Sequence, residues 1–193
     1  MAQLKMLLID SPEIICPPPA GYFIRTHSYE NGGLNADCEG WAVACEKLCG
    51  GIKTPDEVKG MMLDDPDCGP GRIYYICRES DGRICATATA KFSPSLPTLH
   101  MVGAANASMG LGLSRPVCAE AVNAMIRAGK RRIGLSTDDF RVPAIKTYLK
   151  LGFRPWYWQD DMKDRWRKLF DEMGYDRGDY FAYNSRFDIR VGI

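Results

Sequence analysis

The sequence has little of what several protein classes require. It has no surplus of charge, because 25 Lys and Arg residues stand against 24 Asp and Glu, a formal net charge of +1 over 193 residues. A protein that binds nucleic acid or an anionic membrane through its overall field needs a clear basic excess. Neither is therefore expected as a partner, and any anion site must be local.

Long apolar runs and an N-terminal leader are also missing. No stretch approaches the roughly 20 apolar residues of a membrane span, and residues 1–10 run into Ser11-Pro12-Glu13 without a small-residue cleavage site. Eight cysteines fall below the density of disulfide scaffolds, so we interpret them as reduced thiols. These absences predict a cytoplasmic protein that does not meet a membrane.

The composition is that of a globular protein, with 46% hydrophobic, 10% aromatic and 25% charged residues. A chain of this length buries roughly 70% of the surface that its unfolded form exposes, enough for one substantial core. Three consecutive prolines at 17–19 forbid helix and favour an extended conformation. We therefore predict an extended N-terminal arm over residues 1–20 and a single folded domain over residues 21–193.

Hydrophobic periodicity predicts alternating strands and helices. Segments rich in aromatic and β-branched residues predict strands over 22–27, 72–78, 83–92, 99–102, 131–137 and 153–158. Apolar residues at helical spacing predict helices over 34–48, 54–63, 117–126 and 143–151. The chain then ends in a helix over 160–173 and strand-like segments over 180–183 and 187–191. This order predicts an α/β (α+β) fold in which helices flank a largely mixed sheet.

A glycine-containing turn lies between a predicted strand and the best-patterned helix. Its sequence is Met109-Gly110-Leu111-Gly112-Leu113-Ser114. Glycine permits a tight turn with inward-pointing N–H groups, and the following helix adds unpaired N–H donors and the positive end of its dipole. Such a turn can bind a phosphate or a pyrophosphate. The alternative is a tight connection that binds no ligand.

Two nucleotide-binding motifs do not fit this turn. A dinucleotide-binding turn needs an early parallel β-α-β unit, whereas this turn follows a meander and has Ser114 at the third glycine position. A P-loop needs Gly-Lys-Ser/Thr, and this turn contains no lysine. Both nucleotide-binding classes are therefore excluded.

Several segments together point to a known family. They are residues 99–103, the glycine turn, the helix over 117–126, and residues 131–135 and 144–153. With these segments the chain resembles the GNAT superfamily of N-acetyltransferases, and it is distantly similar to the branch that contains mycothiol synthase, although it carries only one such domain. The resemblance implies a GNAT-like mixed central sheet flanked by helices, with a C-terminal helix and strand extension.

The resemblance also implies acetyl-CoA as the cosubstrate. In the family, the motif Gln/Arg-x-x-Gly-x-Gly/Ala binds the pyrophosphate through backbone amides, and the ungapped alignment places Met109, Gly112 and Ser114 on it. Met109 cannot make the side-chain contact of the family's Gln or Arg, but the backbone donors remain. Arg115 could replace the positive charge of the missing arginine. Ser114 is expected to cap the helix. The implied acetyl-CoA-binding residues are Val102, Gly103, Ala104, Met109, Gly110, Leu111, Gly112, Leu113, Ser114, Arg115 and Arg141.

Acetyl transfer to an amine needs a polarised thioester carbonyl, a base for the amine and a proton for the departing thiolate. By resemblance, the motif Tyr-x-x-x-Gly-Phe, present at Tyr148, Gly152 and Phe153, assigns Tyr148 as the general acid; a core tyrosine is the alternative. His100 is the candidate base because its unperturbed pKa is about 6.5. The alternatives are a structural histidine, with water or a carboxylate from elsewhere as the base.

Other chemistry-bearing residues have structural explanations. Asp138-Asp139 ends a predicted strand and is assigned no role. Cys45 and Cys49 share a helical face but lack the spacing and the histidine partner of a metal or redox site, so buried small apolar residues are expected. The aromatic stretch 156–158, with Trp166, either lines an acceptor pocket or packs in the core. No metal site is predicted.

The sequence thus predicts an acyltransferase that moves the acetyl group of acetyl-CoA to the amine of a small molecule by direct attack on the thioester. The alternative is a catalytically inactive GNAT-like CoA-binding sensor or protein-interaction domain, which the substitutions at Met109 and Ser114 favour. A protein N-terminal or lysine acetyltransferase has less support because no acidic groove is visible. An exposed final strand could pair across a homodimer.

Overall fold

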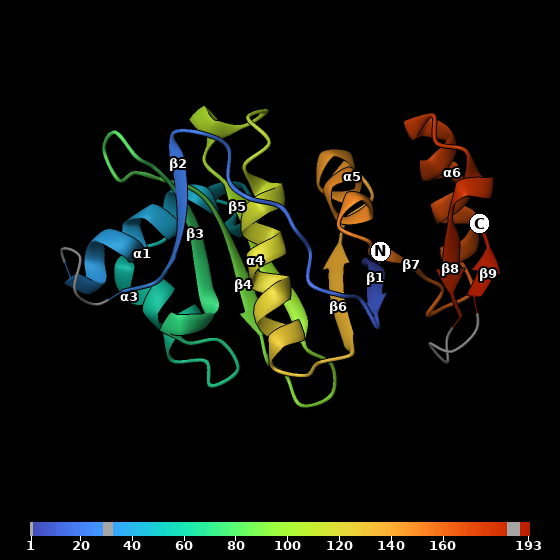
Figure 1. Ribbon diagram of the computed structural model, residues 1–193, viewed down its shortest axis with the longest axis horizontal. Helices are drawn as coiled ribbons and strands as arrows, with labels where there is room; N and C mark the ends of the chain where they lie inside the picture. Colours follow the sequence, from blue (N-terminus) through green and yellow to red (C-terminus); the bar gives the residue numbers. More distant parts are fainter. Residues whose placement is uncertain (1, 29–32, 185–189) are drawn as a thin grey trace. The chain divides into compact units, whose positions relative to one another are not determined.

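The computed structural model describes residues 2–28, 33–184 and 190–193, and it comprises two compact units. Unit 1 consists of Met1–Ser11 and Arg131–Ile193, and unit 2 of Pro12–Lys130. Each unit has its own strands and helices (Figure 1). The range predicted as one domain, 21–193, therefore includes parts of both units.

Unit 2 is built on an antiparallel sheet in the order β2-β3-β4-β5. Its strands are β2 (Tyr22–Thr26), β3 (Ile73–Arg78), β4 (Ile84–Lys91) and β5 (Thr98–Ala104). Strand β4 is buried over almost its whole length because strands flank it and helices cover both of its faces. The hairpin and the following strand predicted from the sequence are confirmed.

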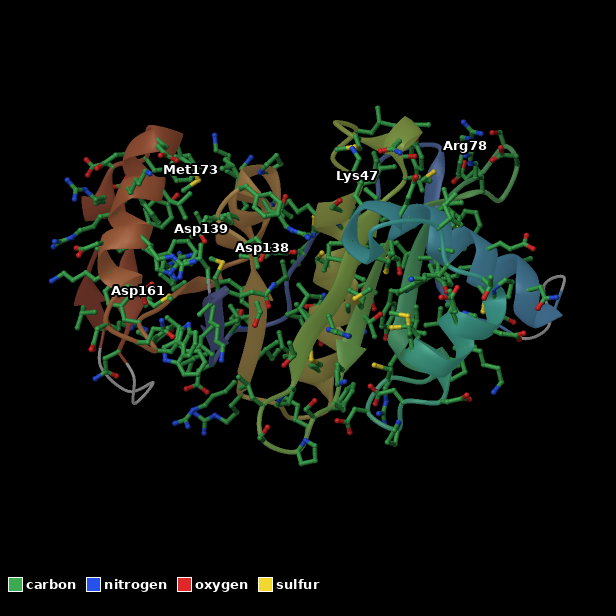
Figure 2. The ribbon with its side chains drawn as sticks, turned by 180° about the vertical axis from the view of Figure 1, so that it is seen from behind. Lys47, Arg78, Asp138, Asp139, Asp161 and Met173 are labelled. Carbon is green, nitrogen blue, oxygen red and sulfur yellow. The ribbon has the colours of Figure 1, made fainter. Side chains whose placement is uncertain are left out.

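Helices cover both faces of this sheet. Helix α4 (Ser114–Arg127) lies on one face, and α1 (Gly33–Ala44) lies with α3 (Pro55–Val58) on the other, as the opposite views of Figures 1 and 2 show. Helix α2 (Glu46–Cys49) directly follows α1. Short helical turns occur at Lys59–Leu63 (η1), Pro70–Arg72 (η2) and Asn106–Ser108 (η3).

The cysteines of unit 2 serve as small apolar residues. All eight cysteines of the chain are free thiols, and Cys38, Cys45 and Cys77 are fully buried beside Trp41 in the core between α1 and the sheet. Burial raises the pKa of the Cys45 thiol well above its ordinary value, which makes it unreactive. Cys49 is only half-buried. The prediction for Cys45 is therefore confirmed.

A buried ionic cluster joins α1 to β2. Arg25 donates two hydrogen bonds to the Asp37 carboxylate, at 2.7 and 2.5 Å, and Ser28 N–H donates a third at 3.0 Å. The His27 Nδ1 atom lies 2.8 Å from the Tyr75 hydroxyl. Burial alone would raise the pKa of Asp37, but the bonds from Arg25 and Ser28 lower it overall. Burial lowers the pKa of His27, and the Asp37 charge opposes this only in part.

This cluster predicts a loss of stability in acid. Because the folded-state pKa of His27 lies below its unfolded value of about 6.5, the unfolded chain binds the proton better, and the free energy of unfolding falls below that pH. A second decrease follows below about pH 4, where the unfolded form of Asp37 takes up its proton first. Urea unfolding from about pH 7.5 to 5.5 should show a smaller decrease for His27→Gln than for the parent. The decrease that persists in His27→Gln comes from the other histidine, His100, whose pKa is also lowered by burial. Identical dependence of the free energy of unfolding on pH in the two proteins would contradict the prediction.

Unit 1 contains a mixed sheet in the order β6-β1-β7-β8-β9. Strand β1 is antiparallel to both β6 and β7, whereas β8 is parallel to β7 through the pair Trp156 and Tyr183. The strands are β1 (Leu4–Ile9), β6 (Arg132–Thr137), β7 (Arg154–Trp156), β8 (Phe181–Tyr183) and β9 (Arg190–Gly192). Its helices are α5 (Val142–Lys150), α6 (Met162–Met173) and the turn η4 (Arg177–Asp179).

The prediction of an extended arm over residues 1–20 is wrong for Leu4–Ile9. This segment is an interior strand of unit 1, and Leu4, Met6 and Leu7 are fully buried. Apolar residues on both of its faces are typical of a strand that is covered on both sides, and the three prolines constrain only the chain beyond it. Residues 12–19 form neither helix nor strand. There Ile14 exchanges two backbone hydrogen bonds with the Asn123 amide of α4, at 2.7 and 3.0 Å.

The helices of unit 1 follow the predicted pattern. Helix α5 is followed by Gly152 with φ +96°, a left-handed value that glycine permits. Helix α6 buries an apolar stripe that includes Met162, Trp166 and Phe170, so Trp166 belongs to the core. Among the helices of the described residues, none combines the length and the apolar character needed to cross a membrane.

Candidate active site

The pairing of β4 with β5 is interrupted by a bulge. Thr87 pairs with Gly103 and Thr89 with His100, so the β5 side contains one more residue than the β4 side. Met101 lies in this bulge with φ +46°, a left-handed conformation that is uncommon for a residue with a long side chain. An extra residue redirects the strand and leaves a backbone group outside the ladder. The bulge therefore changes the direction of the backbone of Val102 to Ala104, the segment expected to bind the thioester end of acetyl-CoA.

Gly103 lies where the end of α1 approaches β5. A Cβ atom at this position would lie 2.5 Å from the Ala44 carbonyl oxygen and 2.9 Å from the Cys45 Sγ atom. These separations are too short for any side chain. Glycine is required here by the close approach of the two backbones, and this contact fixes the end of α1 beside the bulge.

The glycine turn has the predicted backbone conformation. Gly110 and Gly112 have φ values of +81° and +73°, which glycine adopts without strain. A Cβ atom on either glycine would meet open space. The Met109 and Leu111 side chains are about half exposed. The turn therefore presents its backbone at the surface of unit 2.

Helix α4 begins at Ser114, three residues before the predicted start of the helix, and its N-cap is one residue before the predicted one. Leu113 is the N-cap, with helical φ −70° and ψ −25°, and no side chain caps the helix. Ser114 is already the first helical residue, so the prediction that its hydroxyl caps the helix is wrong. The first N–H groups of a helix have no acceptor within the helix, and at the start of α4 no N-cap side chain accepts a hydrogen bond from them. Together with the helix dipole they favour an anion, and the exposed Arg115 side chain lies in the same first turn.

Two contacts that the sequence did not reveal join α2 to the segment before the turn. The Glu46 carboxylate accepts a hydrogen bond from the Asn106 amide at 3.2 Å. The Lys47 ammonium lies 3.3 Å from the Met109 sulfur, and Figure 2 shows Lys47 beside the loop that precedes α4. The residues of each pair are 60 and 62 positions apart in the chain, so no local motif could have indicated either contact.

His100 lies on β5 directly before the bulge and is half-buried. Burial lowers the pKa of its imidazole, and the Lys91 ammonium acts in the same direction. A lowered pKa keeps the imidazole neutral near pH 7, the form that can accept a proton. Its role as a base stays a prediction.

In unit 1, Tyr148 is buried and packs edge-on against Phe153, with ring centroids 6.3 Å apart. The Phe153 N–H donates to the Tyr148 carbonyl at 3.0 Å, and the left-handed Gly152 between them permits this tight return of the chain. The motif that carries Tyr148 therefore forms a compact helix end. The general-acid role is a prediction that this geometry does not test.

Both acidic residues after β6 form ion pairs within unit 1. Arg141, the N-cap residue of α5, donates from Nε to Asp138 at 2.8 Å. Arg165 donates two hydrogen bonds to Asp139, at 3.1 and 2.5 Å. These pairs explain why two acids follow the strand, and neither carboxylate caps α5.

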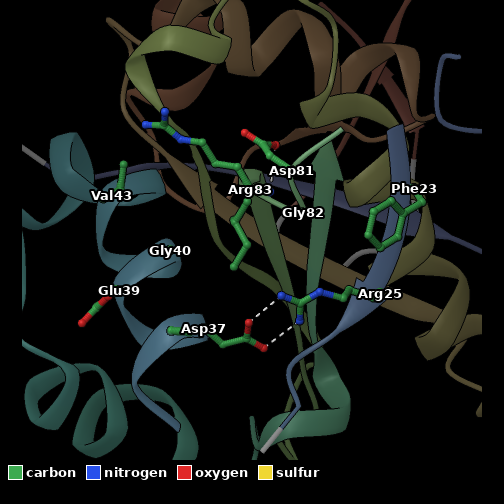
Figure 3. Close-up of a pocket in the computed structure, with 11 residues that line it drawn as sticks. Phe23, Arg25, Asp37, Glu39, Gly40, Val43, Asp81, Gly82 and Arg83 are labelled. Atoms are coloured by element: carbon green, nitrogen blue, oxygen red, sulfur yellow. Dashed lines mark hydrogen bonds and ion pairs between the residues drawn. The ribbon is translucent and has the colours of Figure 1, made fainter. Parts of the chain in front are cut away.

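Each unit contains a cavity. A cavity of about 510 Å³ in unit 2 lies between α1, β2 and the hairpin turn, beside the Arg25 and Asp37 pair (Figure 3). Another, of about 370 Å³ in unit 1, is lined by Tyr157 and Trp158 among others, which keeps the acceptor-pocket alternative open for that stretch. Within the described ranges, no group of three or more His, Cys, Asp or Glu residues could hold a metal ion.

Comparison with known families identifies the family to which the chain belongs. The sequence profile of the Acetyltransferase (GNAT) family matches residues 39–153. The chain therefore belongs to the GNAT acetyltransferase family, and its fold is GNAT-like α/β, as the sequence predicted. A comparison with curated proteins found no match.

Solved structures with the same fold include three described as GNAT proteins. The GCN5-related N-acetyltransferase from Sphaerobacter thermophilus has 20% identity and a TM-score of 0.66, over 80% of this chain and 49% of that one. A putative GNAT acetyltransferase from Novosphingobium aromaticivorans has 19% identity and a TM-score of 0.55, over 80% and 60%. A tandem GNAT protein from the clavulanic acid biosynthesis pathway has 16% identity and a TM-score of 0.58, over 80% and 50%. The chain thus spans only about half the length of these structures, and the likeness to the mycothiol synthase branch stays a prediction.

The contact at Gly103 generates a stability prediction. Gly103→Ala should lower the free energy of unfolding by about 1–3 kcal/mol, because the new Cβ meets the Ala44 carbonyl and the Cys45 sulfur. Gly71→Ala is the matched control, since a Cβ there meets nothing within 4 Å and its φ is not left-handed. Urea unfolding of both variants measures the difference. Equal stabilities for the two variants would show that the close approach does not constrain the fold.

Proposed function

We propose that the protein is an acetyl-CoA-dependent N-acetyltransferase that acetylates the amine of a small molecule. The observation that carries the proposal is the uncapped start of α4 behind a turn with two left-handed glycines, in a chain that belongs to the GNAT acetyltransferase family. The open space at both glycines leaves the backbone accessible to a large anion. A pyrophosphate fits such a set of N–H donors.

In this proposal different segments of the chain contact different parts of acetyl-CoA. The backbone of residues 109–114 binds the pyrophosphate, and Arg115 adds a cation at the first turn of α4. The redirected backbone of Val102, Gly103 and Ala104 binds the pantetheine arm and the thioester carbonyl. Arg141, whose Nε donates to Asp138, is retained as a further phosphate contact.

The proposed reaction is a direct transfer. The acceptor nitrogen attacks the thioester carbonyl carbon, the carbon–sulfur bond breaks, and the acetyl group ends on the nitrogen. Backbone N–H groups beyond the bulge stabilise the negative charge that develops on the carbonyl oxygen. His100 takes the proton that the nitrogen loses, and Tyr148 gives a proton to the departing thiolate.

Composition, free thiols and the edge of a sheet support our proposals for the partner and the compartment. A near-neutral chain without an acidic groove in its sequence gives no reason to expect a protein amine as the acceptor, so we propose a small molecule. Free thiols at all eight cysteines are typical of a reducing compartment, which supports the cytoplasm. Strand β9, the last in the order of the unit 1 sheet, is the proposed contact of a homodimer.

Binding and turnover can be tested with a matched pair of glycine variants. Gly112→Val should weaken acetyl-CoA binding by at least roughly tenfold, because a β-branched side chain opposes φ +73° and fills the space over the turn. Gly129→Val carries the same strain, φ +75°, at the other end of α4, and should lose stability without losing affinity. Isothermal titration gives both affinities, and release of free thiol with a panel of amines gives turnover. No heat from the parent protein would contradict the proposal, and binding without turnover would support the inactive sensor.

The general-acid role can be tested by removing one hydroxyl. Tyr148→Phe keeps the ring packed against Phe153, so acetyl-CoA affinity should be unchanged while kcat falls roughly 100-fold. Tyr175→Phe, whose ring stacks on Tyr180, is the control and should retain full turnover. If Tyr148→Phe turns over at the parent rate, or if it unfolds the protein, Tyr148 is a core residue and not the acid.

A further inference from the structure

The glycine turn offers backbone donors but has no cation of its own. Residues 109–114 contain neither lysine nor arginine, whereas both phosphates of a pyrophosphate carry negative charge. Arg115, at the helix side of the turn, is exposed. The opposite side of the turn begins at Met109, an apolar residue. A cation for that side must come from another part of the chain.

Helix α2 is fixed against the segment that leads into the turn. The missing side chain at Gly103 lets the backbone of Ala44 and the sulfur of Cys45 lie directly on β5. One residue further, the Glu46 carboxylate accepts from the Asn106 amide at 3.2 Å. These two contacts hold α2 against the end of β5 and against the η3 turn.

Lys47 extends from this fixed helix to the start of the glycine turn. Its ammonium lies 3.3 Å from the Met109 sulfur, and a thioether is a weak acceptor that leaves the ammonium able to donate to a stronger one. In the part of the chain that the structure describes, no carboxylate forms an ion pair with Lys47, and the carboxylate of its neighbour Glu46 is bonded to Asn106. The Lys47 charge is thus available at the turn.

We propose that Lys47 supplies the side-chain cation that binds the pyrophosphate of acetyl-CoA at the glycine turn. The inference rests on the proposed function and adds a binding residue from a different helix. The Lys47 ammonium contacts one phosphate at the Met109 side, while the N–H groups of α4 and Arg115 contact the anion from the other. The flexible Met109 side chain supports the lysine stem and competes with the phosphate only weakly.

The test compares three lysine variants with the parent protein by isothermal titration. Lys47→Gln should raise the Kd for CoA about 5- to 10-fold, as expected for one charge-assisted hydrogen bond to phosphate, and Lys47→Arg should keep it near the parent value. Lys130→Gln removes the same charge from an exposed position beyond the far end of α4 and should leave the Kd unchanged. Because Lys47 is exposed, urea unfolding of Lys47→Gln should match that of the parent.

The ligand series identifies which phosphate is bound. Dephospho-CoA retains the pyrophosphate, so Lys47→Gln should weaken its binding by the same factor, whereas binding of pantetheine, which has no phosphate, should be unaffected. A loss with CoA but not with dephospho-CoA would overturn the assignment to the pyrophosphate in favour of the ribose phosphate. Equal CoA affinities for the parent and Lys47→Gln would overturn the role of Lys47 and leave the proposed function intact. A parent that binds no CoA would overturn both.

Discussion

The close contact between the end of α1 and strand β5 at Gly103 determines the arrangement around the candidate site. Because Gly103 has no side chain, the Ala44 carbonyl can lie where a Cβ would otherwise be. The same contact holds the redirected backbone after Met101 on one side and places α2 on the other. The Glu46 to Asn106 hydrogen bond and the contact of Lys47 with Met109 come from the helix that directly follows this approach of two backbones.

At the candidate site, the attraction for an anion is local. The chain has almost no net charge, so attraction for an anion must come from oriented groups rather than from the overall field. The left-handed Gly110 and Gly112 and the uncapped start of α4 provide N–H donors without a buried charge. Backbone donors do not depend on the side chains around them, so the proposed phosphate site tolerates a methionine at position 109. The two cations that we propose to bind the phosphates, Lys47 and Arg115, lie on opposite sides of the turn.

The features with strong local signals were predictable from the sequence, and those set by distant contacts were not. The hairpin around Gly82, helix α4 and the left-handed turn glycines follow from turn chemistry and apolar periodicity. The sequence did not predict strand β1, because the strongest local signal near it is the run of prolines that follows, which forbids helix only beyond the strand. It predicted the cap at Ser114 one residue too late, because Leu113 already has helical dihedral angles. The positive φ of Met101 has no local sequence signal, because a methionine does not mark a left-handed position. The contact of Lys47 with Met109 has none either, because the two residues are 62 positions apart.

We propose that unit 2 binds the pyrophosphate of acetyl-CoA through the backbone of the glycine turn and the start of α4. Amide NMR spectra of the ¹⁵N-labelled protein, recorded during a titration with CoA, test this directly because each backbone N–H gives its own signal. We expect the largest shifts at Gly110, Gly112 and the first residues of α4, while the amide signals of Phe23 and Arg83 beside the unit 2 cavity do not shift. Large shifts around that cavity, with the turn unchanged, would contradict it.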